Sequence, residues 1–233
     1  MNNREYEISE NIKRVQEKIA IAAQKSGRSE KDITLVCVTK NFGIDDINAA
    51  LSCGITDIGE NRVQEMCEKY DKVTPDMWHL IGHLQTNKVK YIIDKADLIQ
   101  SVDSVRLLEE IESQAQKKNV TANILLQVNT SGEQTKFGAE PEKMYELAEI
   151  ASNMKHIKVR GFMTIAPLCV NNISNTLHFS NTHKLCLDIM KKKYDNINMD
   201  YLSMGMSGDF EEAIMCGSNM VRVGSAIFGK RVY

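Results

Sequence analysis

The stretch Leu202–Tyr233, LSMGMSGDFEEAIMCGSNMVRVGSAIFGKRVY, contains two short apolar segments that each end in small residues. One closes on residues 203–208 (SMGMSG) and the other on residues 221–225 (VRVGS), and both predict the carboxyl end of a β-strand. Residues 209–216 between them predict a short helix. The stretch therefore indicates a strand–helix–strand unit, which requires parallel strands.

The predicted helix has its own start signal, with Asp209 as N-cap and Glu212 three residues later as its capping-box partner. That capping leaves the Ser207 hydroxyl and the neighbouring backbone N–H groups to face an anion. Small residues let a backbone approach a ligand closely, and Arg222 adds a fixed set of donors. We therefore expect a phosphate-binding cradle.

Strand and helix patterns alternate through the whole chain, after an opening amphipathic helix with apolar residues at helical spacing from Ile8 to Ala23. We expect eight strands, each but the last followed by a helix, which predicts a (β/α)8 barrel with an extra N-terminal helix. An open doubly wound sheet is the alternative, but no G-x-G-x-x-G turn follows the first strand. The predicted strands are residues 33–40, 56–60, 78–83, 98–102, 124–129, 159–165, 201–206 and 220–224. The predicted helices after the first are residues 44–53, 63–70, 88–95, 104–118, a segment opened by Pro141, 175–193 and 209–216.

Composition sets limits on the class of protein. The chain has 233 residues, 42% of them hydrophobic, and no linker-like tract, so we expect residues 1–233 to form one domain. A net charge of −2 gives no basic footprint for nucleic acid. No apolar run of about 18 residues and no signal peptide occur, so we expect a cytoplasmic protein without membrane association. No interface-sized apolar patch is visible, and we expect a monomer.

The six cysteines are widely spaced and form no C-x-x-C motif. We expect most of them to be reduced, buried apolar residues. They are Cys37, Cys53, Cys67, Cys169, Cys186 and Cys216.

Lys40 closes the first predicted strand and, by period-2 alternation, shares a face with Val36 and Val38. If that face points into the barrel, burial favours the neutral amine, which is the form that attacks an aldehyde. The alternative is a lysine that extends to water at the end of a strand.

Phosphate in such barrels commonly binds after strands seven and eight, where Ser207, Gly224 and Ser225 lie. Strand one adjoins strand eight in a closed barrel, so Lys40 lies beside this cradle. A lysine amine next to a phosphate cradle indicates pyridoxal phosphate (PLP) or a sugar-phosphate aldehyde. Arg222 favours PLP, because an arginine is one of the partners found at its pyridine nitrogen. The alternative for Arg222 is an ion pair inside the barrel.

Other candidate residues are weaker. His79 and His83 are not a metal pair, because four residues along a strand separate them by roughly 13 Å; His83 lines the pocket or lies in the core or rim. Asn61 either bonds a cofactor oxygen or caps the following helix, and Glu60 is either a rim acid or a support for other site residues. The polar loop 130–138 is either a lid or an ordinary exposed loop.

Several segments resemble the pyridoxal phosphate homeostasis protein family, in order and over nearly the whole chain. They are VCVTK around Lys40, GENRVQE (59–65), WHLIGHLQTNK (78–88), SVDS (101–104), QVNTSGEQTKFG (127–138), GFMTIAP (161–167), LSMGMSGDFEEAI (202–214) and MVRVGSAIFGKR (220–231). The departures from the family pattern are Thr39, where serine is common, and Asn41-Phe42 after the lysine.

The resemblance implies a barrel like the N-terminal half of alanine racemases. It implies that Lys40 holds PLP as an internal aldimine, that Ser207, Gly224 and Ser225 take the phosphate, and that Arg222 takes the pyridine nitrogen. Asn61 lies in a segment that borders the cofactor in such proteins.

Three functions remain: a non-enzymatic carrier that passes PLP to apo-enzymes, a PLP-dependent amino-acid racemase, and a Schiff-base aldolase. Racemisation needs an acid/base on each face of the cofactor. In alanine racemases the second base is a tyrosine from another domain and a partner subunit, and only a few residues follow Gly229 here. No tyrosine before Tyr233 lies at the carboxyl end of a predicted strand. We expect a carrier rather than an enzyme.

Overall fold

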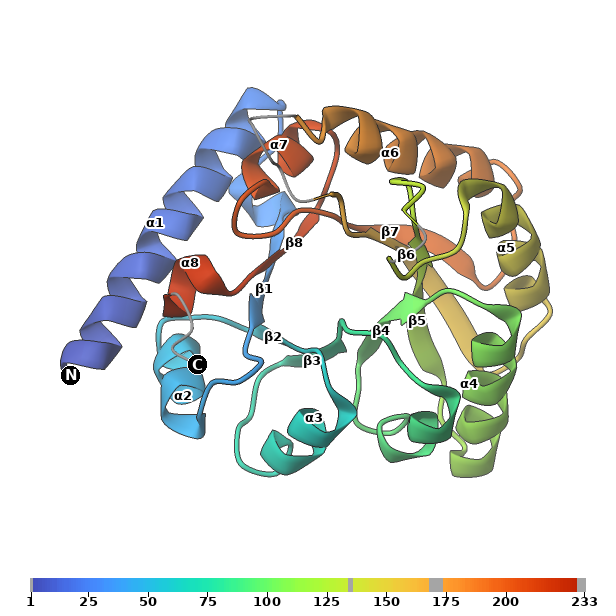
Figure 1. The fold of residues 1–233 in the computed structure, drawn as a ribbon, viewed down its shortest axis with the longest axis horizontal. Helices are drawn as coiled ribbons and strands as arrows, with labels where there is room; N and C mark the ends of the chain where they lie inside the picture. The colour runs from blue at the N-terminus through green and yellow to red at the C-terminus, as the bar shows by residue number, and fades with distance from the viewer. Residues whose placement is uncertain (1, 134–135, 168–173, 230–233) are drawn as a thin grey trace.

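The computed structural model describes residues 2–133, 136–167 and 174–229. Eight parallel strands form a closed barrel in sequence order, with β1 paired to both β2 and β8 (Figure 1). The strands are β1 (Thr34–Val38), β2 (Asp57–Glu60), β3 (Met77–Leu80), β4 (Leu98–Val102), β5 (Ala122–Val128), β6 (Ile157–Thr164), β7 (Ile197–Ser203) and β8 (Met220–Val223). The α-helices are α1 (Asn3–Lys25), α2 (Ile44–Ser52), α3 (Val63–Lys69), α4 (Val105–Lys118), α5 (Met144–Ser152), α6 (Thr176–Met190), α7 (Phe210–Met215) and α8 (Ser225–Phe228). The 3₁₀ helices are η1 (Glu30–Asp32), η2 (Thr86–Tyr91) and η3 (Pro141–Lys143).

The predicted (β/α)8 barrel with an extra N-terminal helix is confirmed, with two local differences. The helix expected at 88–95 is the 3₁₀ helix η2, which begins two residues earlier and ends at Tyr91. The last strand is followed by the one-turn helix α8.

The predicted capping box at α7 is wrong. Asp209 makes no side-chain cap bond; its Oδ1 accepts from the Met206 N–H at 2.7 Å and so closes the turn before the helix. The Glu212 carboxylate instead accepts from the backbone N–H groups of Asn175 (3.1 Å) and Thr176 (3.0 Å), at the start of α6. Glu212 thereby satisfies donors of the neighbouring helix rather than of its own.

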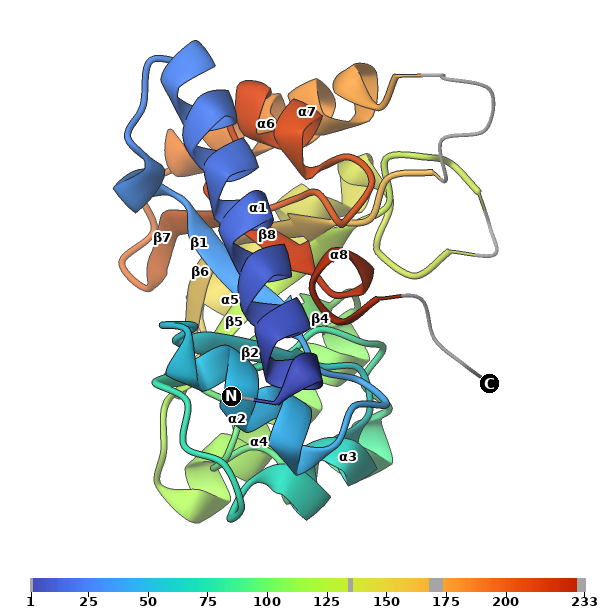
Figure 2. The ribbon, with the colours of Figure 1, turned by 90° about the vertical axis from the view of Figure 1, so that its left-hand side faces the viewer.

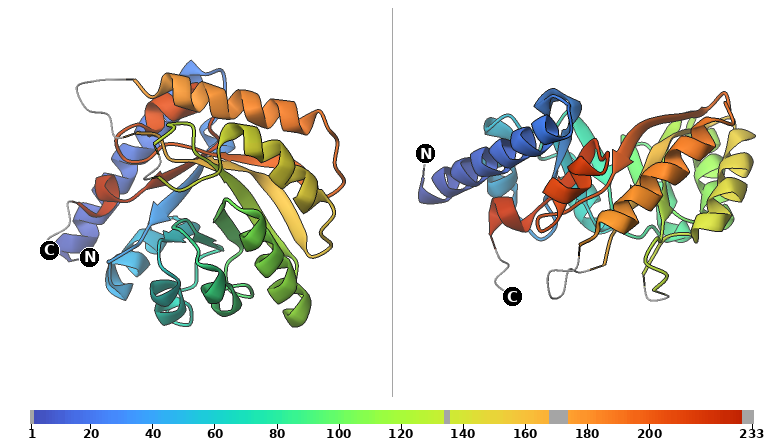
Figure 3. Two further views of the ribbon diagram at one scale, coloured as in Figure 1. Left: turned by 45° about the vertical axis from the view of Figure 1, so that its right-hand side comes forward. Right: turned by 90° about the horizontal axis from the view of Figure 1, so that it is seen from above.

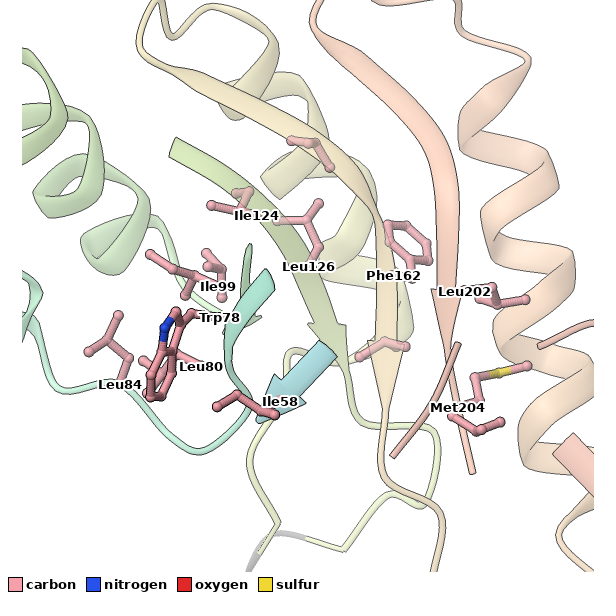
Figure 4. Close-up of a cluster of buried hydrophobic side chains, with 14 of the residues drawn as sticks. Ile58, Trp78, Leu80, Leu84, Ile99, Ile124, Leu126, Phe162, Leu202 and Met204 are labelled. Atoms are coloured by element: carbon pink, nitrogen blue, oxygen red, sulfur yellow. The ribbon is translucent and has the colours of Figure 1, made fainter. Parts of the chain in front are cut away.

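Two apolar layers hold the barrel together. The larger lies between the strands and the helices, and Figure 4 shows part of it, including Ile58, Leu80 and Phe162. The smaller is inside the barrel and consists of Val36, Leu98, Leu125, Met163 and Met220. Alternate strand residues therefore point inward and outward, as expected for a filled barrel.

Helix α1 covers the seam at which the barrel closes. It lies along α2, α7 and α8 on the outside of the strands (Figures 2 and 3). Its side chains also bond the carbonyl groups of α8: Arg4 Nη2 donates to Phe228 O at 3.0 Å and Asn11 Nδ2 to Ile227 O at 2.9 Å. The buried face predicted from the sequence is confirmed. It consists of Ile8, Ile12, Val15, Ile19, Ala22 and Ala23.

The cysteines of the described residues are all free thiols. Cys37 and Cys186 are buried, and burial raises the pKa of Cys186 to about 11 and that of Cys37 further still. Cys53, Cys67 and Cys216 are only partly buried, so the expectation that most cysteines lie in the core is wrong for these three. Cys169 lies outside the described residues.

Within the described ranges, no helix has both the length and the apolar character needed to cross a bilayer.

We predict that Ile12→Ala lowers the free energy of unfolding by about 2–5 kcal/mol, because the side chain is 1% exposed and its removal leaves a cavity against the barrel seam. Ile21→Ala on the same helix is the control; that side chain is 51% exposed, and we expect a change within about 0.5 kcal/mol. Urea unfolding of both variants measures the difference. Equal losses would contradict the packing described for α1.

Candidate functional site

The carboxyl ends of β1 and β8 bring Lys40 and the predicted phosphate cradle to one rim of the barrel. Val36 is in register with Arg222, and a Cβ placed on Gly224 would lie 3.2 Å from Val38 Cβ. Beyond the strands, the Phe42 ring stacks on the Phe228 ring of α8 with centroids 4.4 Å apart. Helix α8 and the described part of the loop after β5 extend to the same side of the barrel (Figure 2).

Lys40 lies two residues beyond the end of β1, not within the strand as predicted. It is half-buried and belongs to a turn closed by the Phe42 N–H, which donates to Thr39 O at 3.1 Å. Asn41 follows in the left-handed region with φ of 65°, a conformation that asparagine tolerates better than most residues.

A buried polar cluster fixes the backbone on both sides of Lys40. The Lys69 ammonium donates to Thr39 O (2.9 Å), to Glu60 Oε1 (2.7 Å) and to Glu65 Oε2 (3.3 Å). Thr39 Oγ1 also donates to Glu60 Oε1 at 2.6 Å, and the Asn41 N–H donates to Glu65 Oε2 at 2.7 Å. The turn that carries Lys40 is thus held by one cation and two carboxylates.

Sequence reasoning gave Glu60 two roles and missed Lys69. Glu60 is fully buried, which raises the pKa of its carboxyl group, while the bonds from Lys69 and Thr39 oppose that rise. It supports Lys40 through Thr39 rather than standing as an acid at the rim. Lys69 was missed because a lysine on a short helix is usually solvated, and only its i,i+4 spacing from Glu65 pointed to a partner.

Ser207 connects the end of β7 to the first turn of α8. Its Oγ accepts from the backbone N–H groups of Gly224 and Ala226, both at 3.3 Å. These two N–H groups are therefore directed at the hydroxyl oxygen, not left for an anion as predicted from the sequence. The hydroxyl proton remains as the donor that Ser207 can offer to a phosphate. Ser225 is exposed at the same turn.

Arg222 is 4% exposed and lies below this turn, inside the barrel. Nη1 donates to Ser203 Oγ at 2.5 Å and Nη2 to Thr164 O at 2.8 Å. Burial lowers the pKa of Arg222 to about 10 and the Asp209 charge opposes this, so the guanidinium stays charged at neutral pH. Two of its five N–H groups are used, which leaves three without an acceptor among the described residues.

Asn61 has an unsatisfied oxygen. Its Oδ1 is buried and accepts no hydrogen bond from the residues described. Helix α3 begins after Arg62 without a side-chain cap, so the helix-capping role considered for Asn61 is wrong. Gly82 packs so closely against the backbone of Asn61 that a Cβ added to Gly82 would lie 2.2 Å from the backbone carbonyl oxygen of Asn61. The residue is therefore fixed at the rim with an acceptor to offer.

The two histidines of the WHLIGHLQ segment lie in different parts of the barrel. His79 is buried inside the barrel and bonds Asp57, whereas His83 is exposed at the rim. The His83 ring stacks on the Phe137 ring with centroids 4.0 Å apart, which joins the loop after β5 to the segment that follows β3. Residues 134–135 of that loop lie outside the described ranges. No cluster of His, Cys, Asp and Glu suited to a metal ion occurs in the parts of the chain searched, residues 2–133, 136–167 and 174–229.

The donor set fits a phosphorylated aldehyde with a ring acceptor. A lysine lies on the same rim as the Ser207 hydroxyl, a buried arginine retains three unused N–H groups, and an unsatisfied amide oxygen lies at the end of β2. These groups have the chemistry that a small anionic ligand requires at the carboxyl rim of the barrel.

Comparison with known proteins gives the class and then the family. Residues 8–232 match the family described as "Alanine racemase, N-terminal domain". The chain is 41% identical over 226 residues to the pyridoxal phosphate homeostasis protein of Aquifex aeolicus, covering 96% of this chain and 98% of the relative. It belongs to the pyridoxal phosphate homeostasis protein family, within the wider alanine racemase N-terminal domain class.

Two solved structures support this assignment. A protein of unknown function from Bifidobacterium adolescentis superimposes with a TM-score of 0.91 at 34% identity, covering 98% of this chain and 97% of that one. PipY of Synechococcus elongatus PCC7942, solved with PLP bound, superimposes with a TM-score of 0.81 at 28% identity, covering 95% and 100%. The bound PLP in PipY agrees with the cofactor predicted from the sequence.

We predict that Lys69→Met lowers the free energy of unfolding by about 3–5 kcal/mol at pH 8, because it leaves the buried Glu60 carboxylate without its cation. The loss should be smaller at pH 5. The pKa of Glu60 is raised above its ordinary value of 4.5 in the folded state and rises further without Lys69. Between the Glu60 pKa of the unfolded chain and that of the folded variant, Glu60 is protonated only in the folded state. The stability of the variant therefore falls as the pH rises between these two pKa values.

Urea unfolding at both pH values measures these changes. Lys72→Met, at an exposed position just after the same helix, is the control and should change stability by less than about 0.5 kcal/mol. A loss for Lys69→Met that does not vary with pH would contradict the role given to Glu60.

Proposed function

We propose that this chain is a cytoplasmic, non-enzymatic PLP-binding protein that holds the cofactor on Lys40 and takes part in PLP homeostasis. The observation that carries the proposal is the closure of β1 on β8, which sets the Lys40 turn against α8 through Phe42 and Phe228. Residues 1–233 act as one binding domain, and the protein functions as a monomer that delivers PLP to apo-enzymes. The Aquifex relative is named for homeostasis and not as an enzyme, which agrees with the prediction of a non-enzymatic role.

Each contact follows from the chemistry of the donor. The Lys40 amine condenses with the cofactor aldehyde to form a Schiff base, with loss of water. Ser207 donates its hydroxyl proton to the phosphate, and Gly224 and Ser225 bring the backbone of the same turn close to it. Arg222 donates one of its unused N–H groups to the pyridine nitrogen. A charged donor at that nitrogen disfavours its protonation and so weakens the ring as an electron sink.

Asn61 supplies the remaining polar contact. Its buried Oδ1 takes a hydrogen bond from a protonated oxygen of the cofactor, which would satisfy an acceptor that otherwise costs about 1–3 kcal/mol to leave unpaired.

The tyrosines favour binding over racemisation. A racemase needs a second base on the opposite face of the cofactor. None of the six tyrosines in the described residues directly follows the carboxyl end of a strand: Tyr6 is in α1, Tyr70 ends α3, Tyr91 is in η2, Tyr145 is in α5, Tyr194 precedes β7 and Tyr201 is within β7.

We predict that borohydride reduction of the protein saturated with PLP attaches the cofactor permanently to Lys40, because reduction converts a Schiff base into a stable secondary amine. Peptide mapping by mass spectrometry identifies the labelled lysine. Lys40→Ala should abolish the adduct, and Lys88→Ala, after β3 on the same rim, should retain it. Labelling spread over surface lysines, or release of D-alanine from L-alanine at enzyme-like rates, would contradict the proposal.

Arg222→Ala should speed loss of the cofactor by about 10- to 100-fold, because it removes a charged donor from a buried site. Dissociation is measured as transfer of PLP to an excess of an apo-enzyme, recorded by the activity that the acceptor gains. Arg62→Ala is the control, since that side chain is 73% exposed at the rim. Retention equal to that of the unmodified protein would remove Arg222 from the site.

A further inference from the structure

A chain of hydrogen bonds crosses the interior of the barrel and ends on Arg222. Asp57 Oδ1 lies 2.9 Å from His79 Nε2, and His79 Nδ1 lies 3.0 Å from Gln100 Nε2. Gln100 Oε1 accepts from Ser203 Oγ at 2.7 Å, and Ser203 Oγ accepts from Arg222 Nη1 at 2.5 Å. The five residues come from five strands, β2, β3, β4, β7 and β8.

The donors and acceptors of this chain can be assigned in one direction only. A guanidinium has no acceptor, so Arg222 donates to Ser203, and the Ser203 proton is directed to Gln100 Oε1. The Gln100 amide nitrogen then faces both His79 Nδ1 and Met220 Sδ, the latter at 3.2 Å, and gives one proton to each. If the Gln100 amide were turned by 180°, its oxygen would lie against the Met220 sulfur, and neither of these two acceptors could donate a hydrogen bond to the other.

His79 is consequently neutral and carries its proton on Nε2, which donates to the Asp57 carboxylate. Protonation at Nδ1 would set one N–H group against another at Gln100. The chain therefore runs from a cation through three neutral side chains to an anion, with every proton directed toward Asp57.

The charges explain why such a chain is needed. Arg222 is a buried cation whose two bonded acceptors, a hydroxyl and a backbone carbonyl, are neutral. A buried charge is costly unless it is compensated. Asp209 is the carboxylate whose charge acts on it directly, and Asp57, at the start of β2 and 13% exposed, is the carboxylate at the other end of the hydrogen-bonded series.

We propose that Asp57, His79, Gln100 and Ser203 are positioning residues that hold Arg222 in the orientation needed to bind the pyridine ring. The inference rests on the proposed function of Arg222 as the partner of the cofactor, and extends it to residues that do not themselves bond the cofactor. These four side chains fix which N–H groups of Arg222 are already occupied and which remain for the ligand.

The first test needs no cofactor. Nitrogen-15 NMR of the cofactor-free full chain labelled at histidine should show His79 with a protonated Nε2 and an unprotonated Nδ1, assigned by its loss in His79→Gln. A protonated His79 Nδ1 at neutral pH would contradict the hydrogen bonds assigned between Asp57 and Arg222.

The second test measures PLP dissociation in a double-mutant cycle. Gln100→Met should speed cofactor loss about threefold to tenfold in the natural background and have no further effect in Arg222→Ala, because it acts through Arg222. Ser203→Ala should behave in the same way and is a second variant should Gln100→Met not fold. An equal effect in both backgrounds, or none in either, overturns the positioning role.

Ser218→Ala is the matched control. Ser218 is also a fully buried serine, but its hydroxyl bonds only the backbone carbonyls of Leu202, Met204 and Met220. It should lower the thermal midpoint without changing PLP dissociation. If Arg222→Ala does not change PLP dissociation, Arg222 does not bind the cofactor, and the four residues then have no role in cofactor retention. The His79 tautomer is a separate test, because it reports on the hydrogen bonds between Asp57 and Arg222 whether or not PLP binds there.

Discussion

The pairing of β1 with β8 is the constraint on which the rest of the site depends. It closes the sheet and sets residues from the two ends of the sequence in register, Val36 beside Arg222 and Cys37 beside Val223. Because both strands run in the same direction, their carboxyl ends meet at one rim. The amine of Lys40, the Ser207 hydroxyl and the α8 turn share that rim for this reason, although Lys40 lies more than 160 residues before the other two along the chain.

The interior of this barrel contains an apolar region and a polar region. An apolar layer of five side chains fills one part, and a polar chain from Asp57 to Arg222 crosses another. Polar groups inside a protein stabilise a unique arrangement only when their partners are complete. The same requirement applies around Lys69, where one ammonium group serves Thr39, Glu60 and Glu65 together. One oxygen of Glu60 nevertheless has no partner among the residues described.

Periodicity and turn chemistry predicted the barrel, its strand order and the buried face of α1, because each depends on local sequence and on a connection rule that holds for parallel strands. The candidate residues Lys40, Ser207, Gly224 and Ser225 followed from their positions at strand ends. What failed depended on distant partners. Asp209 and Glu212 have the spacing of a capping box, yet Asp209 accepts from the nearby Met206 N–H and from the distant Asn175 side chain. The Glu212 carboxylate accepts from backbone N–H groups at the start of α6, and no local pattern reveals these donors. Lys69 and Gln100 were missed for the same reason, since the Lys69 ammonium donates to Thr39 O beyond β1 and Gln100 Oε1 accepts from Ser203 of β7.

The contacts of α1 have a consequence for how the chain is made. Its apolar stripe packs on α7 and α8, which the ribosome synthesises long after α1, and its Arg4 and Asn11 side chains bond carbonyl groups at Phe228 and Ile227. The apolar face of α1, which also contacts α2, is therefore fully covered only after α7 and α8 have been synthesised. Nascent chains stalled before residue 225 should therefore leave part of the apolar face of α1 open to chaperones, because the barrel cannot close until β8 and α8 are available.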